Sequence, residues 1–435
     1  MLLYPLIAIL LCLSGFYIVK LTQNVYLGWV SLLVIDLYSY GFGNRQGMVG
    51  ALHLSPGDGI SMCLLVAGAL RSIPRMKESN TPRMLAFGYF FLIFLSYARG
   101  VFINGFTTAS NEARGLVAPI AGVLYFLTAP VDEESIRKYI DAYILYGVGL
   151  LVIAVLAYAG FNVGAEAWAQ SDTASAGIDG RLLPSAPAAA LAICFLLTLA
   201  RAQYRQSSVW YRFLPILFLG MAIYLRHRTV WMMLIVCGLC LPFVEQKLTR
   251  RFLAIGFAIA ILVGAVLLVQ PQIVTENSSQ FEDSTQNTGT FMWRVNSWAQ
   301  LVWDEDQTVL TVLTGDEMGH GSWRYVPEAG KYEDVAPHSE YVSEYTRVGL
   351  IGVIFLVIYI VWPLKYTLRR SKDDNLAVDP SWGTWALVVI GAMVYGFTYS
   401  IEGDFYALIA IANAMVVAHR RDSESEAPEL VRLPA

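Results

Sequence analysis

Long apolar runs follow one another along almost the whole chain and are separated by polar stretches. Runs of about 17 to 22 residues recur, and this is the length of helix that crosses the hydrocarbon core of a bilayer. The runs are continuous and do not alternate between apolar and polar positions, so they predict helices and not the strands of a barrel. The expected spans are 2–19, 25–43, 57–71, 84–99, 114–130, 139–161, 185–201, 212–226, 229–245, 251–270, 346–364, 382–399 and 404–419. The pattern predicts an all-α polytopic membrane protein with about 12–13 transmembrane helices.

The basic residues indicate how these spans are oriented. If residues 72–83 lie in the cytoplasm, 20 of the 30 lysines and arginines fall on that side, as expected from the positive-inside rule. The long polar segment between the tenth and eleventh spans, and the N-terminus, then lie outside. The predicted parts are ten spans in 1–270, a large external loop in 271–345, the C-terminal spans in 346–419 and a cytoplasmic tail in 420–435.

The external loop contains an expected helix at residues 290–303. Its apolar residues are spaced four, three and four positions apart, which places them on one face, and they are Phe291, Val295, Trp298 and Val302. Such a helix would lie on the membrane surface, with Arg294 and Trp298 sharing part of one side. Three glycines within residues 315–321 predict a tight irregular turn after it.

The end of the loop brings a histidine to the membrane boundary. Pro337 suits the first turn of a helix, and a helix starting there would place His338, Tyr341 and Tyr345 on one face. A neutral imidazole in this position is suited to act as a base near neutral pH.

The cysteines and the acidic residues of the loop predict neither a disulfide framework nor a metal site. The five cysteines lie inside apolar runs, so they predict no disulfide framework for the loop, and they are Cys12, Cys63, Cys194, Cys237 and Cys240. Residues 304–306 have the spacing of a metal-binding acidic motif, but they belong to a loop with 13 acidic and 3 basic residues. We interpret them as a solvated charge run, and we expect no metal and no cofactor.

The short external connections contain more arginines than their lengths would suggest. Arg99 and Arg114 flank one connection, with Glu112 beside them, Arg181 precedes the seventh span, and residues 226–229 form a turn with two arginines. Cations at the outer edge of a membrane are unusual. An anionic ligand attached to a lipid would explain them.

In order along residues 175 to 365, these features resemble the O-antigen ligase and O-antigen polymerase superfamily of bacterial envelope enzymes. The resemblance is carried by Gly180-Arg181, by Arg228-Thr229, by Arg294 with Trp298 and Gly315-x3-Gly319, and by His338-Ser339-x-Tyr341 with Gly349-x2-Gly352. Each piece alone is weak, and their order together with one large loop makes the likeness specific. The N-terminal spans match only as generic apolar helices.

The resemblance implies a GT-C-like glycosyltransferase of the bacterial inner membrane, with the large loop in the periplasm and no metal. The donor would be a glycan on undecaprenyl pyrophosphate, and the acceptor a hydroxyl of a lipid A core or of another glycan. The family's roles place a base at His338 and pyrophosphate-binding groups at Arg181, Arg228 and Arg294, and we add Tyr341 as a substrate-binding residue. Membrane lipids are the other expected partners, and no nucleic acid is expected.

Other functions are compatible with parts of the sequence. A repeat-unit polymerase would differ from a ligase only in its acceptor, and we favour the ligase because the order of motifs is closest to it. A transporter of polysaccharide precursors would need charged residues within its spans, for which Asp36 and Asp141 are the candidates. A non-catalytic assembly factor would leave the arginines unexplained.

Overall fold

The computed structural model describes residues 3–43, 47–49, 52–75, 80–165, 182–202, 208–244, 249–257, 289–303, 307–326, 330–370 and 382–425. Its helices are α1 (Leu3–Gln23), α2 (Val25–Phe42), α3 (Pro56–Ser72), η1 (Ile73–Arg75), α4 (Thr81–Asn104), α5 (Phe106–Phe126), α6 (Glu133–Tyr158), α8 (Ser185–Arg201), α9 (Trp210–Tyr224), α10 (Arg228–Val244), α13 (Gly289–Val302), α14 (Val309–Thr314), α15 (Glu340–Arg370), α16 (Trp382–Gly396) and α17 (Gly403–Ser425). Two antiparallel hairpins pair β1 (Gly47–Val49) with β2 (Leu52–Leu54) and β3 (Trp323–Val326) with β4 (Lys331–Asp334).

The helices follow the apolar runs of the sequence. Among the described residues, four helices are long and apolar enough to cross a membrane, and these are Val25–Phe42, Thr81–Asn104, Glu133–Tyr158 and Glu340–Leu368. Four shorter helices, α8, α9, α10 and α16, are also apolar. The span expected at 251–270 lies outside the described residues beyond residue 257. The prediction of a mostly helical protein with apolar, membrane-type helices is therefore confirmed.

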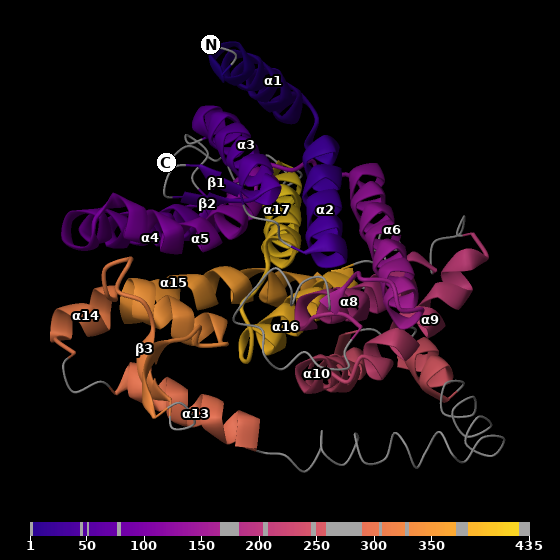
Figure 1. Ribbon diagram of the computed structural model, residues 1–435. Coiled ribbons are helices and arrows are strands. Elements are labelled where there is room, and N and C mark those ends of the chain that lie inside the picture. Colours follow the sequence, from indigo (N-terminus) through magenta and orange to yellow (C-terminus); the bar gives the residue numbers. More distant parts are fainter. Residues whose placement is uncertain are drawn as a thin grey trace, which may run out of the picture.

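Burial divides the helices into an inner and an outer set. Every residue of α8 from Ala186 to Ala200 is buried, and α16 and the first half of α17 are nearly as enclosed. A helix that is apolar on all sides is stable in a protein core or in a membrane, and other helices surround α8. Figure 1 shows α16 and α8 side by side within the bundle, with α10 and α15 beside them.

The outer helices expose large apolar side chains. Phe91 and Phe94 on α4, Leu145 on α6, and Leu239 and Phe243 on α10 are each at least 60% exposed. A water-soluble monomer rarely leaves so many apolar side chains in contact with solvent. In a membrane, lipid chains would cover these faces and keep the apolar side chains out of water.

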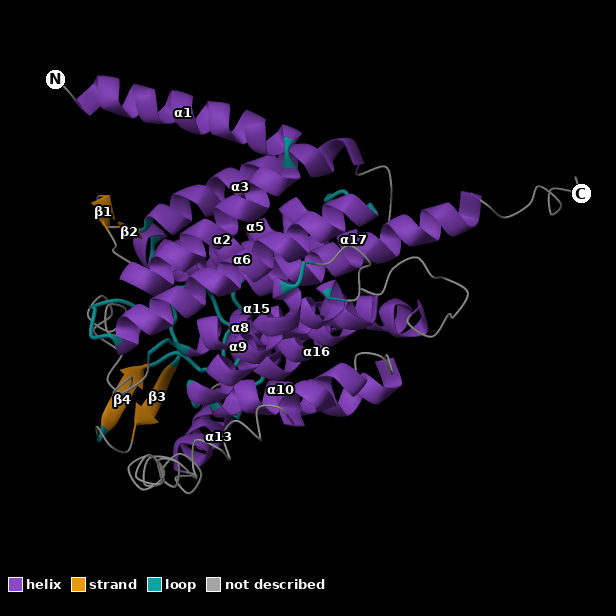
Figure 2. Cartoon of the chain, turned by 90° about the vertical axis from the view of Figure 1, so that its right-hand side faces the viewer, coloured by secondary structure: helices purple, strands orange, loops and turns teal. Residues whose placement is uncertain are grey.

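The two ends of the bundle differ. In Figure 2, both hairpins and the start of α1 lie at the left end of the helices, and α17 runs toward the right end. The hairpin β3–β4 of the expected external loop therefore lies at the left end of the bundle, with α13 packed against β3 and α14 against α15. The predicted helix at 290–303 is confirmed as α13, Gly289–Val302.

Glycines bring the loop into backbone contact with α15. Gly315 and Gly349 both have positive φ, of 74° and 66°. A Cβ atom at Gly349 would lie 2.3 Å from the carbonyl carbon of Leu313, and one at Gly315 would lie 2.4 Å from the carbonyl carbon of Arg347. Gly349 also interrupts the helical dihedral angles of α15. Glycine is therefore required on both sides of this contact, which also confirms the tight turn expected at residues 315–321.

Replacing Gly349 with alanine is expected to lower the free energy of unfolding by about 2–5 kcal/mol, because the side chain adds both strain and a clash. Thermal unfolding of the purified protein and the rate of proteolysis within the loop would measure the effect. Gly115→Ala is the matched control, since a Cβ there meets nothing within 4 Å. Equal stability of the two variants would contradict the expected backbone contact.

Candidate functional site

Three consecutive carbonyl groups before His338 are held by side chains of the loop. Arg324 on β3 donates from its two terminal nitrogens to the carbonyls of residues 335–336, at 2.7 and 2.9 Å. Trp298 on α13 donates from Nε1 to the carbonyl of Pro337 at 2.6 Å. The backbone that leads to His338 is thus fixed by two different elements of the loop.

The conformation of His338 differs from the one expected. The helix predicted to begin at Pro337 begins instead at Glu340, and His338 precedes it with φ of 53°. The prediction that His338, Tyr341 and Tyr345 share a helical face was therefore wrong. Among the described residues other than glycine, only Arg226 and His338 have positive φ. Such strain costs about 1–3 kcal/mol and persists where surrounding contacts enforce it, as the three held carbonyls do here.

The turn after α16 brings the predicted site residues together. The guanidinium carbon of Arg294 lies 4.8 Å from the ring centre of Tyr399, and Nη1 of Arg294 donates to the carbonyl of Thr398 at 3.2 Å. The ring of His338 meets the same Tyr399 ring edge to face, with 6.4 Å between centres. We call residues 398–399 the platform. It places a permanent cation and an imidazole around one aromatic ring.

The start of α10 reaches the same platform. The hydroxyls of Thr229 and Thr398 lie 2.6 Å apart, within hydrogen-bonding distance. Arg228, the residue before Thr229, is exposed and is the first residue of α10. The positive end of the α10 dipole therefore points toward the platform, which favours a negative ligand there.

The other predicted site residues are placed as follows. Arg181 lies outside the described residues. The segment that follows it is anchored nearby, since the carbonyl of Leu183 lies 3.0 Å from Nε2 of His227. Tyr341 is part-buried in α15, and its hydroxyl donates to the carbonyl of Met393 at 3.1 Å. Tyr341 therefore joins α15 to α16, and this bond gives it a structural role beside the substrate contact predicted for it.

The environment of His338 keeps its imidazole neutral. Burial and, in the same direction, the charges of Arg294 and Arg324 lower the pKa of His338 to about 4. Among the described residues, its ring nitrogens have no hydrogen-bond partner. A neutral imidazole with a free nitrogen can accept a proton from a bound group.

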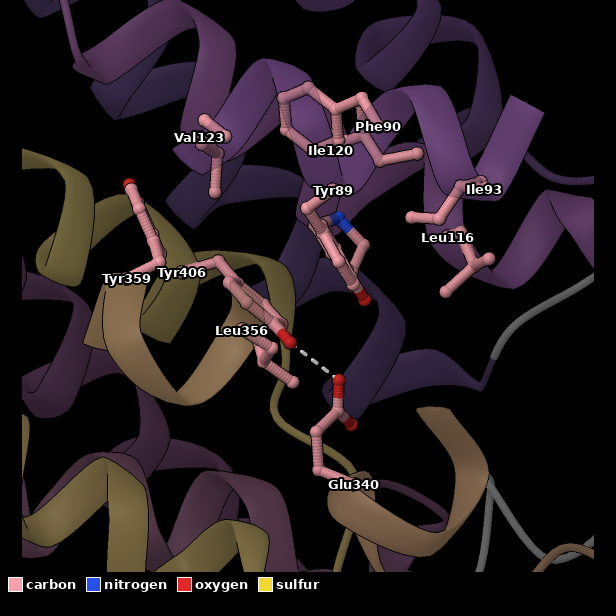
Figure 3. A pocket seen from close by; sticks show the side chains of 12 residues that line it. Tyr89, Phe90, Ile93, Leu116, Ile120, Val123, Glu340, Leu356, Tyr359 and Tyr406 are labelled. Carbon is pink, nitrogen blue, oxygen red and sulfur yellow. Dashed lines mark hydrogen bonds between the residues drawn. The ribbon is translucent and has the colours of Figure 1, made fainter. Parts of the chain in front are cut away.

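Glu340 fixes the first turn of α15 to the residues that follow the platform. Its carboxylate accepts from the backbone N–H of Ile401 at 2.9 Å and from the hydroxyl of Tyr406 at 2.6 Å. Figure 3 shows this second bond beside Tyr89, in a small void of about 10 Å³ between α4, α5, α15 and α17. A void of that size holds about one water. The two hydrogen bonds of Glu340 restrict movement between His338 and Tyr399, which lie close to Glu340 and Ile401 in the sequence.

Two carboxyl groups, those of Glu402 and Asp404, lie between the end of α16 and the first turn of α17. Asp404 is buried and accepts from the hydroxyl of Tyr143 at 2.8 Å. Burial raises the pKa of its neighbour Glu402 to about 8, and the charges of Asp404 and Glu340 contribute. Glu402 therefore stays largely protonated at neutral pH.

Replacing Glu402 with glutamine is expected to stabilise the protein at pH 8 and to change little at pH 5. In the unfolded chain the carboxyl ionises above its ordinary pKa, near 4.5, whereas in the folded chain it keeps its proton up to about pH 8. Stability is therefore lost as pH rises through this interval, and glutamine removes that loss. Thermal midpoints at both pH values would test this, with Glu133→Gln on α6 as control. A glutamine variant less stable than wild type at pH 8 would contradict the assignment.

A second charged network anchors the glycine turn of the loop. Arg99 on α4 donates to the hydroxyl of Thr314 at 3.0 Å and to the carbonyl of Gly315 at 2.9 Å. Glu112 on α5 accepts from the N–H of Gly319 at 2.6 Å and lies 3.5 Å from Arg347. Arg99, which the sequence marked as a candidate for an anionic ligand, thus serves to hold the loop together with Glu112.

Sequence reasoning missed the platform residues and Arg324. Thr398 and Tyr399 belong to no sequence motif, and Arg324 has no regular spacing from His338. Arg324 is one of only three basic residues in an acidic loop, and this was the one signal in the sequence that could have identified it.

Among the described residues, no group of three His, Cys, Asp or Glu side chains could hold a metal, and residues 304–306 lie outside them. Comparison with known proteins adds no relative, since no family model and no curated protein matches the chain.

Proposed function

We propose that this protein is a membrane glycosyltransferase of the O-antigen ligase type. It would cross the bacterial inner membrane with about 12–13 helices in a GT-C-like fold, with residues 271–345 in the periplasm. It would transfer a glycan from undecaprenyl pyrophosphate to a hydroxyl of a lipid A core or another glycan. One observation carries the proposal: Arg294, His338 and the start of α10 come from distant parts of the chain and meet at the platform.

The arginines and the positive end of α10 would stabilise the negative charge of the leaving group. In the proposed reaction the bond between the anomeric carbon and the phosphate oxygen breaks, and undecaprenyl pyrophosphate leaves with the electron pair. Guanidinium groups hold phosphate oxygens bidentately and keep their charge. A cation about 4 Å from a phosphate oxygen contributes about 4 kcal/mol at an effective dielectric near 20. Arg294, together with Arg228 and Arg181, would supply this stabilisation without a metal.

His338 would supply the base. The acceptor hydroxyl attacks the anomeric carbon and its proton passes to the free imidazole nitrogen. With a pKa near 4 the imidazole is neutral but weakly basic. The negative charge of bound pyrophosphate opposes the two arginines and raises the pKa. The base would therefore become stronger when the donor is in place.

A polymerase would use the same site with a second lipid-linked repeat unit as acceptor. Of the two candidates for the transporter alternative, Asp141 forms an ion pair with Arg201 at 2.7 Å. The other, Asp36, has a carboxylate oxygen that is buried and unpaired among the described residues. The charged groups around the platform and around Arg71 lie at the two ends of the helices, whereas a transport path needs them along the bundle.

Reconstituted vesicles would distinguish transfer from transport. The purified protein is incorporated into vesicles that contain an undecaprenyl-pyrophosphate glycan, with EDTA and a mixture of candidate acceptors. Release of undecaprenyl pyrophosphate together with a glycosylated acceptor is the expected result. Movement of intact donor between leaflets without any release would overturn the proposal in favour of transport.

A further inference from the structure

We propose that a second cavity, at the other end of the bundle, binds the phosphate group of an anionic phospholipid. The cavity has a volume of about 550 Å³ and lies where α3 and α17 end and where α2, α4 and α6 begin. Its lining reaches Ala418 on α17, whereas the platform precedes the first residue of that helix. At 1.5 Å per residue the two sites are roughly 20 Å apart along α17, so the cavity is separate from the proposed transfer site.

The cavity is lined by basic side chains and by no described carboxylate. The cations are Arg71, Arg75, Arg83 and Lys138. Lys138 forms an ion pair with Glu134 at 2.6 Å. Arg71 and Arg75 make no ion pair with a described carboxylate. At least two guanidinium charges therefore face the cavity without a negative partner in the described part of the chain.

Backbone contacts hold these guanidinium groups in place. Arg71 donates to the carbonyl of Thr22 at 2.8 Å and to the carbonyl and hydroxyl of Thr128 at 2.8 and 2.9 Å. Arg75 donates to the same Thr128 carbonyl at 3.1 Å, and Arg83 donates to the carbonyl of Arg75 at 2.9 Å. Neutral carbonyls fix the positions of the arginines, and no described carboxylate compensates the charges of Arg71 and Arg75. A rigid cluster of this kind is suited to a phosphate anion.

The rest of the lining indicates that the phosphate belongs to a lipid. Val25, Leu127, Val131 and Val417 give the cavity an apolar wall beside the cations. A phospholipid presents the same combination, because its charged phosphate is followed by acyl chains. Basic pockets between membrane helices bind anionic headgroups in this way, and the volume falls within the usual range for small-molecule sites. A free phosphate ester would use the cations but not the apolar wall.

Native mass spectrometry of the purified full-length protein would test this site. Phosphatidylglycerol is added as the probe, with phosphatidylcholine as the neutral lipid and glycerol 3-phosphate as the soluble ester. Wild type should retain phosphatidylglycerol in preference to phosphatidylcholine. Arg75→Gln and Lys138→Gln should each weaken retention about tenfold, as expected for the loss of one charged hydrogen bond. Arg137→Gln is the matched control, because Arg137 neighbours Lys138 on α6, pairs with Glu133 and does not line the cavity.

The outcomes separate the source of the phosphate from the existence of the site. Retention of glycerol 3-phosphate as strong as that of the lipid would overturn the lipid assignment and leave a site for a free ester. Equal loss in the Arg137 control would show a general charge effect and overturn the site. Retention unchanged in both cavity variants, with thermal midpoints equal to wild type, would also overturn it. Because glycan transfer is not measured, failure here leaves the proposed transferase untouched.

Discussion

Replacing His338 with alanine should lower kcat for glycan transfer by about 10²–10⁴-fold, the range expected for losing a general base. Binding of the donor should remain close to that of wild type, because the pyrophosphate contacts come from arginines. Turnover and donor affinity are measured separately on the purified variant. His320→Ala is the matched control, since His320 is an exposed histidine of the same loop, beside Glu317. Wild-type turnover in the His338 variant would exclude this residue as the base.

The same imidazole determines the expected pH dependence. Only neutral His338 accepts a proton, so activity is lost as pH falls through its pKa. In the free enzyme that value is about 4, and kcat/KM should therefore be flat with respect to His338 from about pH 5 to pH 8. Bound pyrophosphate raises the pKa, so the acid limb of kcat should lie at a higher pH than that of kcat/KM. Coincident limbs would contradict the proposed contact between donor and base.

Replacing Arg294 with lysine should lower kcat/KM by about 10²-fold although the charge is kept. An ammonium group cannot stack as a plane on Tyr399 while donating in a fork to a phosphate. The planar guanidinium does so, and its donor to the Thr398 carbonyl already fixes its orientation. Steady-state kinetics with the lipid-linked donor measure the loss.

Arg212→Lys provides a charge-preserving control, because Arg212 is exposed on α9 and has no contact with the platform. Tyr399→Phe separates the ring from the hydroxyl. It should retain most activity, since the bond from Arg294 to that hydroxyl is long, at 3.4 Å. Full activity of Arg294→Lys would mean that only charge matters at this position, and it would contradict the stacked geometry.

The helices were predictable because apolar runs and helix lengths are both local properties of the sequence. The loop helix α13 was predictable for the same reason, since its apolar spacing is complete within one segment. The glycine turn was predictable as a turn. Its contact with Gly349 was not, because two glycines that allow close approach carry no sign of each other in the sequence.

The site was predictable in part. Arg294, His338 and the start of α10 were identified from order and residue type, and the structure brings them to one place. Tyr399 was missed because an aromatic residue at the end of an apolar run looks like any interfacial tyrosine. The conformation of His338 was missed because proline is favoured in the first turn of a helix. Here Arg324 and Trp298 hold the preceding carbonyls in other directions.

Buried charge was the least predictable feature. Glu402 and Asp404 follow an apolar run and look like a solvated turn in the sequence. Their environment depends on Tyr143 from α6 and on Glu340 from α15. Both residues precede the turn by more than 60 positions in the sequence. No local pattern reports such packing.

The most direct measurement is photocrosslinking with an undecaprenyl-pyrophosphate glycan that carries a photoreactive group next to the pyrophosphate. After irradiation of the purified protein, mass spectrometry identifies the labelled peptides. Labelling of the segments that contain Arg294, His338 and Tyr399, reduced by unlabelled donor, is the predicted result. Labelling that is confined to the basic cavity around Arg71, or that unlabelled donor does not reduce, would contradict the platform as the donor site.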